Sequence, residues 1–105
     1  MNYYKRGFLN KDEGLAAFVA NVNFEASQCQ HSYYINAGFT ISDCSRQITL
    51  DFDVSDYDAG DYDKAMYKLN TLINELQEFN TKLTIAKIEF DIAKVQLELK
   101  DMNDT

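Results

Sequence analysis

The residues best suited to do chemistry lie in one acidic segment, residues 51–63, which holds six aspartates and no lysine or arginine. Carboxylates attract lysine and arginine clusters, and an interleaved tyrosine adds the rigid contact area common at interface hot spots. We therefore predict that this segment binds a basic protein surface; an acidic face that only keeps the chain soluble is the alternative. The candidate partner-binding residues are Asp51, Asp53, Asp56, Tyr57, Asp58, Asp61 and Asp63.

The same aspartates do not match a calcium-binding loop. An EF-hand loop needs glycine at position 6 and a bidentate acid at position 12. A loop that starts at Asp51 has Asp56 at the glycine position and Tyr62 at the last position. A loop that starts at Asp56 has Asp61 at the glycine position. We predict no metal site, with a loose Ca²⁺ or Mg²⁺ site as the alternative; capping of a following helix by Asp58 or Asp61 explains part of the segment.

Catalytic and transition-metal chemistry have little support. Cys29, His31 and Cys44 are only three soft ligands, and a strand expected between the cysteines separates Cys44 from the other two. That separation also predicts no disulfide within one chain. His31 is the only histidine, and no P-loop, dinucleotide-binding glycine pattern or hydrolase motif occurs. We predict a protein that is not an enzyme and that uses no cofactor.

The charge of the chain excludes several classes of partner. The 105 residues carry a formal net charge of −7 and are 46% hydrophobic, which indicates one folded domain with an acidic surface. Such a surface repels nucleic-acid phosphates and anionic lipids, so we expect neither direct nucleic-acid binding nor a membrane partner. We identify no signal peptide or membrane span in the sequence. The expected location is cytoplasmic, in the host cytoplasm if the protein is phage-encoded.

The elements that position these residues begin with a sheet. From about residue 17 to residue 54, apolar and polar residues alternate, which is typical of strands with one buried face. We expect three strands, at about residues 18–27, 32–41 and 47–54, whose short connections make them antiparallel in a meander. The face predicted to be buried comprises Phe18, Ala20, Val22, Phe24, Ala26, Tyr33, Ile35, Ala37, Phe39, Ile41, Ile48, Leu50, Phe52 and Val54.

Residues 3–9 have two interpretations. They can form a fourth strand at the edge of the sheet, followed by a turn at residues 10–14. Asn10 and Glu13 also resemble a capping box that opens a short helix. Gly7 and Gly14 bracket the segment and favour the strand.

Residues 61–105 contain no glycine and no proline, and apolar residues recur in them with a seven-residue period. The first set is Tyr62, Leu69, Leu76, Leu83, Phe90 and Leu97, and the set three residues later is Ala65, Leu72, Phe79, Ala86 and Ala93. This is the a/d pattern by which helices pack side by side. We predict one helix from residue 61 to about residue 100, whose first half covers the apolar face of the sheet.

The second half of this helix is apolar on two sides. A second stripe lies opposite the a/d stripe, and only a helix with neighbours on both sides tolerates this arrangement. The helix would reach roughly 60 Å, about twice the length of a nine-residue strand, so its second half needs cover from other copies. We predict a homo-oligomer whose interface comprises Leu83, Ile85, Ile88, Phe90, Ile92, Val95, Leu97 and Leu99. Two strands, at residues 83–92 and 94–100, are the alternative, although no turn residue separates them.

A compact acidic chain of about this length, with a short meander, a helix and no catalytic motif, resembles the small phage-encoded inhibitors of bacterial defence, the anti-CRISPR proteins and their relatives. Some of these proteins present carboxylates in place of nucleic-acid phosphates, and others sequester signalling nucleotides as oligomers. The resemblance covers the size, charge and build of the whole chain and implies an inhibitory role. It carries no functional residue over, because no motif of a single family is matched.

These patterns predict an α+β fold, in which a three- or four-stranded antiparallel sheet from residues 1–60 packs on a long C-terminal helix from residues 61–105 that also oligomerises. The predicted function is non-catalytic binding, as a homo-oligomeric inhibitor whose acidic segment engages a basic protein target. The first alternative is a structural or assembly coiled-coil protein. The second is a small-ligand sponge that holds a nucleotide between subunits, with Lys5, Arg6 and Arg46 offsetting the acidic charge.

Overall fold

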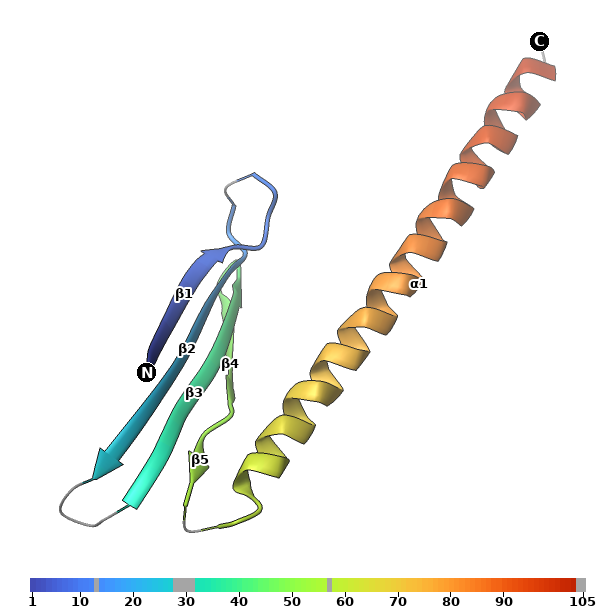
Figure 1. Cartoon of the computed structure of the whole chain (residues 1–105). Coiled ribbons are helices and arrows are strands. Elements are labelled where there is room, and N and C mark those ends of the chain that lie inside the picture. The colour runs from blue at the N-terminus through green and yellow to red at the C-terminus, as the bar shows by residue number, and fades with distance from the viewer. Residues whose placement is uncertain (13, 28–31, 57, 104–105) are drawn as a thin grey trace. The chain divides into compact units, whose positions relative to one another are not determined.

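A computed structural model describes residues 1–12, 14–27, 32–56 and 58–103 (Figure 1). These residues form β1 (Asn2–Phe8), β2 (Ala17–Ser27), β3 (Ser32–Asp43), β4 (Arg46–Asp51), β5 (Val54–Ser55) and α1 (Asp61–Asn103). The chain divides into two compact units, one from Met1 to Leu69 and the other from Asn70 onward. The first unit therefore contains the sheet and the first turns of α1, and the second contains the rest of α1.

All the described strands belong to one antiparallel sheet. Its order is β1-β2-β3-β4, and β5 pairs with β3 beyond the end of β4 (Figure 1). Each strand pairs with a neighbour close in sequence, so the sheet is the predicted meander and the α+β prediction is confirmed. Of the two interpretations of residues 3–9, the edge strand is confirmed as β1 and the short helix is wrong.

The register of the strands places the predicted apolar side chains on one face of the sheet. Phe39 of β3 pairs with Ala20 of β2 and with Leu50 of β4, and directly paired residues project from the same face. The rings of Phe18 and Phe39 stack with their centroids 5.8 Å apart. A Cβ on Gly7, the β1 partner of Phe18, would lie 3.0 Å from that ring, so glycine leaves room for the ring over the edge strand.

The third predicted strand is interrupted. The alternation predicts one strand over residues 47–54, but β4 ends at Asp51 and β5 begins at Val54. At the break, the Phe52 amide still donates to the Ala37 carbonyl at 2.9 Å, while the Ala37 amide donates to Oδ1 of Asp53 at 2.7 Å. A side-chain carboxylate thus replaces the backbone carbonyl of a regular ladder, and one predicted strand becomes two.

The β3–β4 hairpin closes through a two-residue turn, Cys44 and Ser45, which is tighter than the predicted connection. Asp43 pairs with Arg46 across it. Cys44 has a φ angle of 56°, in the left-handed region where glycine is favoured, and two-residue hairpin turns commonly have glycine there. Cys44 is an exposed free thiol. Cys29 lies outside the described residues, so the expected separation of the two thiols stays a prediction.

The long C-terminal helix is confirmed. α1 is continuous from Asp61 to Asn103, and the alternative of two strands after residue 83 is wrong. Asp61 and Asp63 in its first turn and Lys100 in its last turn complement the helix dipole. In the described part of the chain no helix is both long and apolar enough to cross a membrane. The cover of the sheet by the first half of α1 stays a prediction.

Apolar burial is incomplete throughout the described residues. No hydrophobic side chain among them is buried, and the one buried polar residue among them is Ser32, at 8% exposure. Large apolar side chains in both the sheet and the helix are exposed to solvent, such as Phe24 of β2 at 51% exposure and Phe79 of α1 at 65%. Each unit, taken by itself, therefore has large apolar side chains that are available for further packing.

Replacing Cys44 with glycine should stabilise the protein by about 1 kcal/mol, because glycine adopts a positive φ without the strain that a side chain brings. The measurement is the free energy of unfolding in urea at one fixed protein concentration. Ser45→Gly is the matched control, since it adds the same backbone freedom at a residue whose φ is not positive. Equal effects of the two substitutions would contradict the prediction.

Candidate functional site

The six aspartates of the acidic segment follow the chain from the end of the sheet into the helix. Asp51 ends β4, Asp53 lies in the break, Asp56 follows β5, Asp58 precedes α1, and Asp61 and Asp63 belong to its first turn. Tyr57, which was predicted to share the surface, lies outside the described residues. Within this segment, the aspartates therefore lie at or near each point where one element ends and the next begins.

The first two aspartates hold the break between β4 and β5. The Asp53 amide donates to Oδ1 of Asp51 at 2.8 Å, a hydrogen bond to a side chain two residues back that is typical of an Asx turn. Asp53 in turn accepts the Ala37 amide of β3 through its own Oδ1. Each carboxylate thus accepts a backbone N–H in the region where the ladder is interrupted.

Two further aspartates, Asp56 and Asp61, form hydrogen bonds at the end of β5. Oδ2 of Asp56 accepts the Tyr33 amide at 2.8 Å, while the Asp56 amide donates to the Tyr33 carbonyl at 3.2 Å. Oδ2 of Asp61 accepts both the amide and the hydroxyl of Ser55, at 3.1 and 2.9 Å. Because Asp61 is the first residue of α1, this pair of bonds joins the start of the helix to β5.

Asp58 organises the turn that enters α1. Its Oδ1 accepts the Gly60 amide at 2.8 Å, and its Oδ2 lies 3.1 Å from Nζ of Lys64. The Gly60 hydrogen bond, and then Lys64, hold the pKa of Asp58 below its ordinary value of 3.8. A lowered folded-state pKa means that this stabilisation is present above the unfolded-state value and is lost as the pH falls through the folded-state value.

Two lysines from α1 reach back over the same region. Lys68 Nζ donates to the Asp51 carbonyl at 2.7 Å and lies 5.0 Å from the centroid of the Phe52 ring. With Lys64, Lys68 lines a shallow depression of about 360 Å³. Its other lining residues are Asp51, Phe52, Asp53, Asp61 and Ala65. The two ammonium groups partly offset the aspartates, so the surface is less acidic than the sequence suggests.

The arrangement leaves carboxylate oxygens of the acidic segment available at the surface. Asp51, Asp53 and Asp56 are exposed, and in the described part of the chain each uses one carboxylate oxygen for an internal hydrogen bond. Their second oxygens are left to solvent or to a partner. The side chain of Asp63, in contrast, makes no hydrogen bond or ion pair with any described residue. The described residues include no group of three His, Cys, Asp or Glu side chains placed to hold a metal ion.

The predicted oligomer interface lies entirely in the second unit. Its members are all exposed, from 45% for Ile85 to 62% for Leu83. The other members are Ile88, Phe90, Ile92, Val95, Leu97 and Leu99. Since α1 is continuous through these residues, the structure places the two predicted stripes on opposite sides of one helix. Whether they contact a second copy stays a prediction.

Sequence reasoning missed the structural use of the aspartates. It assigned only Asp58 or Asp61 to helix capping, whereas five of the six aspartates accept hydrogen bonds from this chain. The spacing in the sequence could have predicted two of these hydrogen bonds, because Asp51-x-Asp53 and Asp58-x-Gly60 both fit Asx turns. The roles of Asp53 and Asp56 had no such signal, since their partners on β3 are distant in sequence.

Comparisons of the chain with protein-family models, with curated proteins and with solved structures gave no match in any of the three.

Asp61→Ala should destabilise the protein by about 1–2 kcal/mol, because it leaves the half-buried Ser55 amide and hydroxyl without their shared acceptor. Asp63→Ala, in the same helical turn, should change stability by less than about 0.5 kcal/mol. The measurement is the free energy of unfolding of both variants under identical conditions. Equal losses would show that helix-dipole effects, and not the Ser55 bonds, account for the role of Asp61.

Proposed function

We propose that this chain is a non-catalytic protein that self-associates through α1 and binds a basic protein surface through its acidic segment. The observation that supports it best is the character of the second unit, a lone helix with apolar side chains exposed on opposite sides. Ile88 is 54% exposed on one side and Phe90 is 61% exposed on the other. Helices in proteins gain most of their stability from packing against other elements, so we expect this helix to pack against other helices.

The acidic segment supports the binding half of the proposal. Backbone hydrogen bonds fix Asp51, Asp53 and Asp56 in exposed positions, and a fixed group loses less conformational entropy on binding than a mobile one. The net charge of −7 steers basic partners toward the protein. A rigid array of carboxylates is therefore suited to a target that presents lysine and arginine side chains.

The biological role we propose is inhibition of a bacterial defence system, in the manner that the resemblance to anti-CRISPR proteins implies. Its target would be a protein whose basic surface ordinarily contacts nucleic-acid phosphates, because the carboxylates of this chain carry the same sign of charge. The protein would act by occupying that surface, without turnover and without a cofactor.

A structural or assembly role is the second candidate, and one observation favours it. Five of the six aspartates accept hydrogen bonds within their own chain, which gives the acidic segment a purpose that needs no partner. In that case the helix is the functional element, and the carboxylates organise the sheet edge and keep the assembly soluble.

Ile88→Asp combined with Ile92→Asp should reduce the assembly to smaller species, down to dimers or monomers, or give insoluble chain, because each carboxylate would be buried against apolar partners. The measurement is the molar mass by size-exclusion chromatography with light scattering. Asn74→Asp with Thr84→Asp adds the same charge at polar positions of α1 and should leave the assembly intact. A wild-type protein that runs as a monomer at micromolar concentration would refute the self-association.

Partner binding should weaken when Asp53, Asp56 and Asp58 are replaced with asparagine, which keeps an acceptor oxygen but removes the charge. We expect the association rate with a target captured from bacterial lysate to fall and its salt dependence to flatten. Asp12→Asn, Asp43→Asn and Asp101→Asn together form the control with the same net charge. If both triple variants associate at the wild-type rate, the assembly role is the better explanation of the acidic segment.

A further inference from the structure

We propose that residues 70–99 of α1 pair antiparallel with the same residues of a second copy, in the register that places Leu83 opposite Ala86 of the second copy. This inference rests on the self-association proposed above and adds its orientation and register. It starts from the second unit, which contains α1 alone and begins at Asn70. In this register residue 70 lies opposite residue 99, so the pairing covers almost the whole unit and leaves the first turns of α1 with the sheet.

The apolar side of the pair is the a/d stripe of the second unit. Its residues are Leu72, Leu76, Phe79, Leu83, Ala86, Phe90, Ala93 and Leu97. In an antiparallel coiled coil, the residues at position a of one helix lie opposite the residues at position d of the other helix. The register sets Leu83 against Ala86 and Leu76 against Ala93 of the second copy, so a large side chain meets a small one in both layers. Leu72 and Phe79 then contact the second copy in place of the sheet cover expected from sequence.

Charges that flank this stripe select the register. Lys82 comes directly before Leu83, and Glu89 comes directly before Phe90; both apolar residues occupy heptad position a. Neither charged residue forms an ion pair with a described residue of its own chain. With Leu83 opposite Ala86, Lys82 lies beside Glu89 of the second copy. Two-fold symmetry repeats the contact, because Glu89 of the first copy meets Lys82 of the second. The pairing therefore gains two attractive contacts and brings no like charges together at these positions.

Neighbouring registers are repulsive. If Leu83 faced Phe79 of the second copy, the two Lys82 side chains would meet, and Glu75 would meet Glu89. If Leu83 faced Ala93, the two Glu89 side chains would meet. In a parallel pair, Lys82 of each copy would lie beside Lys87 of the other copy. These two repulsive contacts would cancel the two attractive contacts between Glu89 and Lys94.

One other antiparallel register is attractive, and the structure disfavours it. With Leu83 opposite Leu72 of the second copy, Lys82 meets Glu75, but the pairing must extend into residues 62–69. There Lys68 already donates to the Asp51 carbonyl at 2.7 Å, and Leu69 is half-buried. That register would also leave the last turns of α1 without a neighbour.

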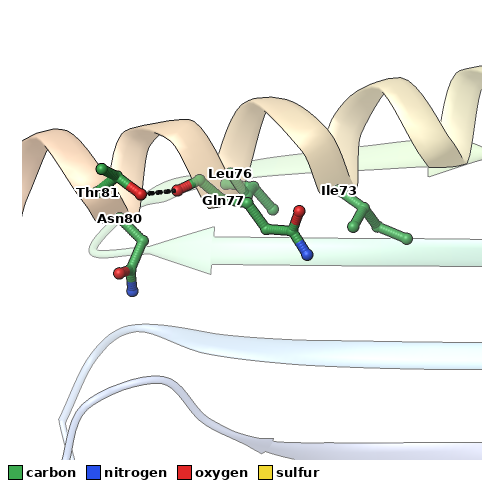
Figure 2. Close-up of a pocket in the computed structure, with 5 residues that line it drawn as sticks. All are labelled: Ile73, Leu76, Gln77, Asn80 and Thr81. Carbon is green, nitrogen blue, oxygen red and sulfur yellow. Dashed lines mark hydrogen bonds between the residues drawn. The ribbon is translucent and has the colours of Figure 1, made fainter.

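A shallow groove on α1 lies at one side of the proposed interface. Figure 2 shows the five residues that line this shallow cavity of about 460 Å³, which are Ile73, Leu76, Gln77, Asn80 and Thr81. Of these, Leu76 belongs to the a/d stripe. The Thr81 hydroxyl donates to the Gln77 carbonyl at 3.1 Å and so is turned toward its own helix. In the proposed register Ile73 lies beside Lys94 of the second copy, and Asn80 lies beside Lys87. The aliphatic stem of a lysine can cover an isoleucine while its ammonium group stays in water.

Cysteine cross-linking tests the orientation and register. Leu83→Cys and Ala86→Cys are made separately in a chain that also carries Cys29→Ser and Cys44→Ser, and the two variants are mixed and mildly oxidised. We expect a mixed disulfide between positions 83 and 86 as the main product, mapped by peptide analysis. A mixture of Leu83→Cys with Leu72→Cys is the control for the competing register and should cross-link at least tenfold less. Homodimeric 83–83 and 86–86 disulfides, or efficient 83–72 bridging, would overturn the inference.

Charge reversal tests the same register without cysteines. Lys82→Glu should weaken self-association roughly tenfold, because it replaces two attractive contacts by two repulsive ones. Lys82→Glu with Glu89→Lys restores both pairs at the wild-type net charge and should return within about threefold of wild type by analytical ultracentrifugation. A double variant as weak as the single one would refute the Lys82–Glu89 contact. A monomeric wild-type chain would instead refute the proposed self-association itself, while an assembly with other cross-links would refute only this register.

Discussion

The first unit depends on the hydrogen bonds that aspartate side chains make to backbone amides at the broken edge of the sheet. Where β4 gives way to β5, β3 loses the regular ladder that would satisfy its N–H groups, and an unsatisfied amide away from water is costly. Asp53 accepts the Ala37 amide, and Asp56 accepts the Tyr33 amide. Asp61 then accepts Ser55 and determines where α1 begins. The course of the chain from sheet to helix follows from this sequence of bonds.

The acidic segment consequently has two properties that are usually found apart. It organises the backbone, and it presents charge at the surface, because a carboxylate that accepts one amide still has a second oxygen. The helix shows the complementary property, since it is well formed but buries none of its described residues. Among the described residues, no buried side-chain polar atom lacks a hydrogen-bond partner, whereas many large apolar side chains are exposed.

Much of the fold could be predicted from the sequence because it depends on periodicity. Two-residue alternation identified the apolar face that Phe39, Ala20 and Leu50 share, and seven-residue recurrence identified α1. The break after Asp51 could not be predicted, because apolar alternation continues through Phe52 and Val54 as if the strand were whole. The hydrogen bonds that maintain the break join residues 16 and 23 positions apart, which no local pattern encodes. The interruption is thus a tertiary property, in which a side chain of one strand competes with the backbone of another.

The two edges of the sheet are poorly suited to the addition of strands from other molecules. Unpaired strand edges recruit strands from other molecules, and this hazard grows when large apolar side chains are exposed. On one edge the bend at residues 52–53 and the Asp61 bond to the Ser55 amide interrupt the straight row of groups that an incoming strand needs. On the other edge β1 carries Lys5 and Arg6 in succession, one on each face of the strand, and these charges oppose stacking of identical chains in register. Growth by strand addition is therefore hindered on both sides of the sheet, whereas the backbone groups of α1 are already paired within the helix.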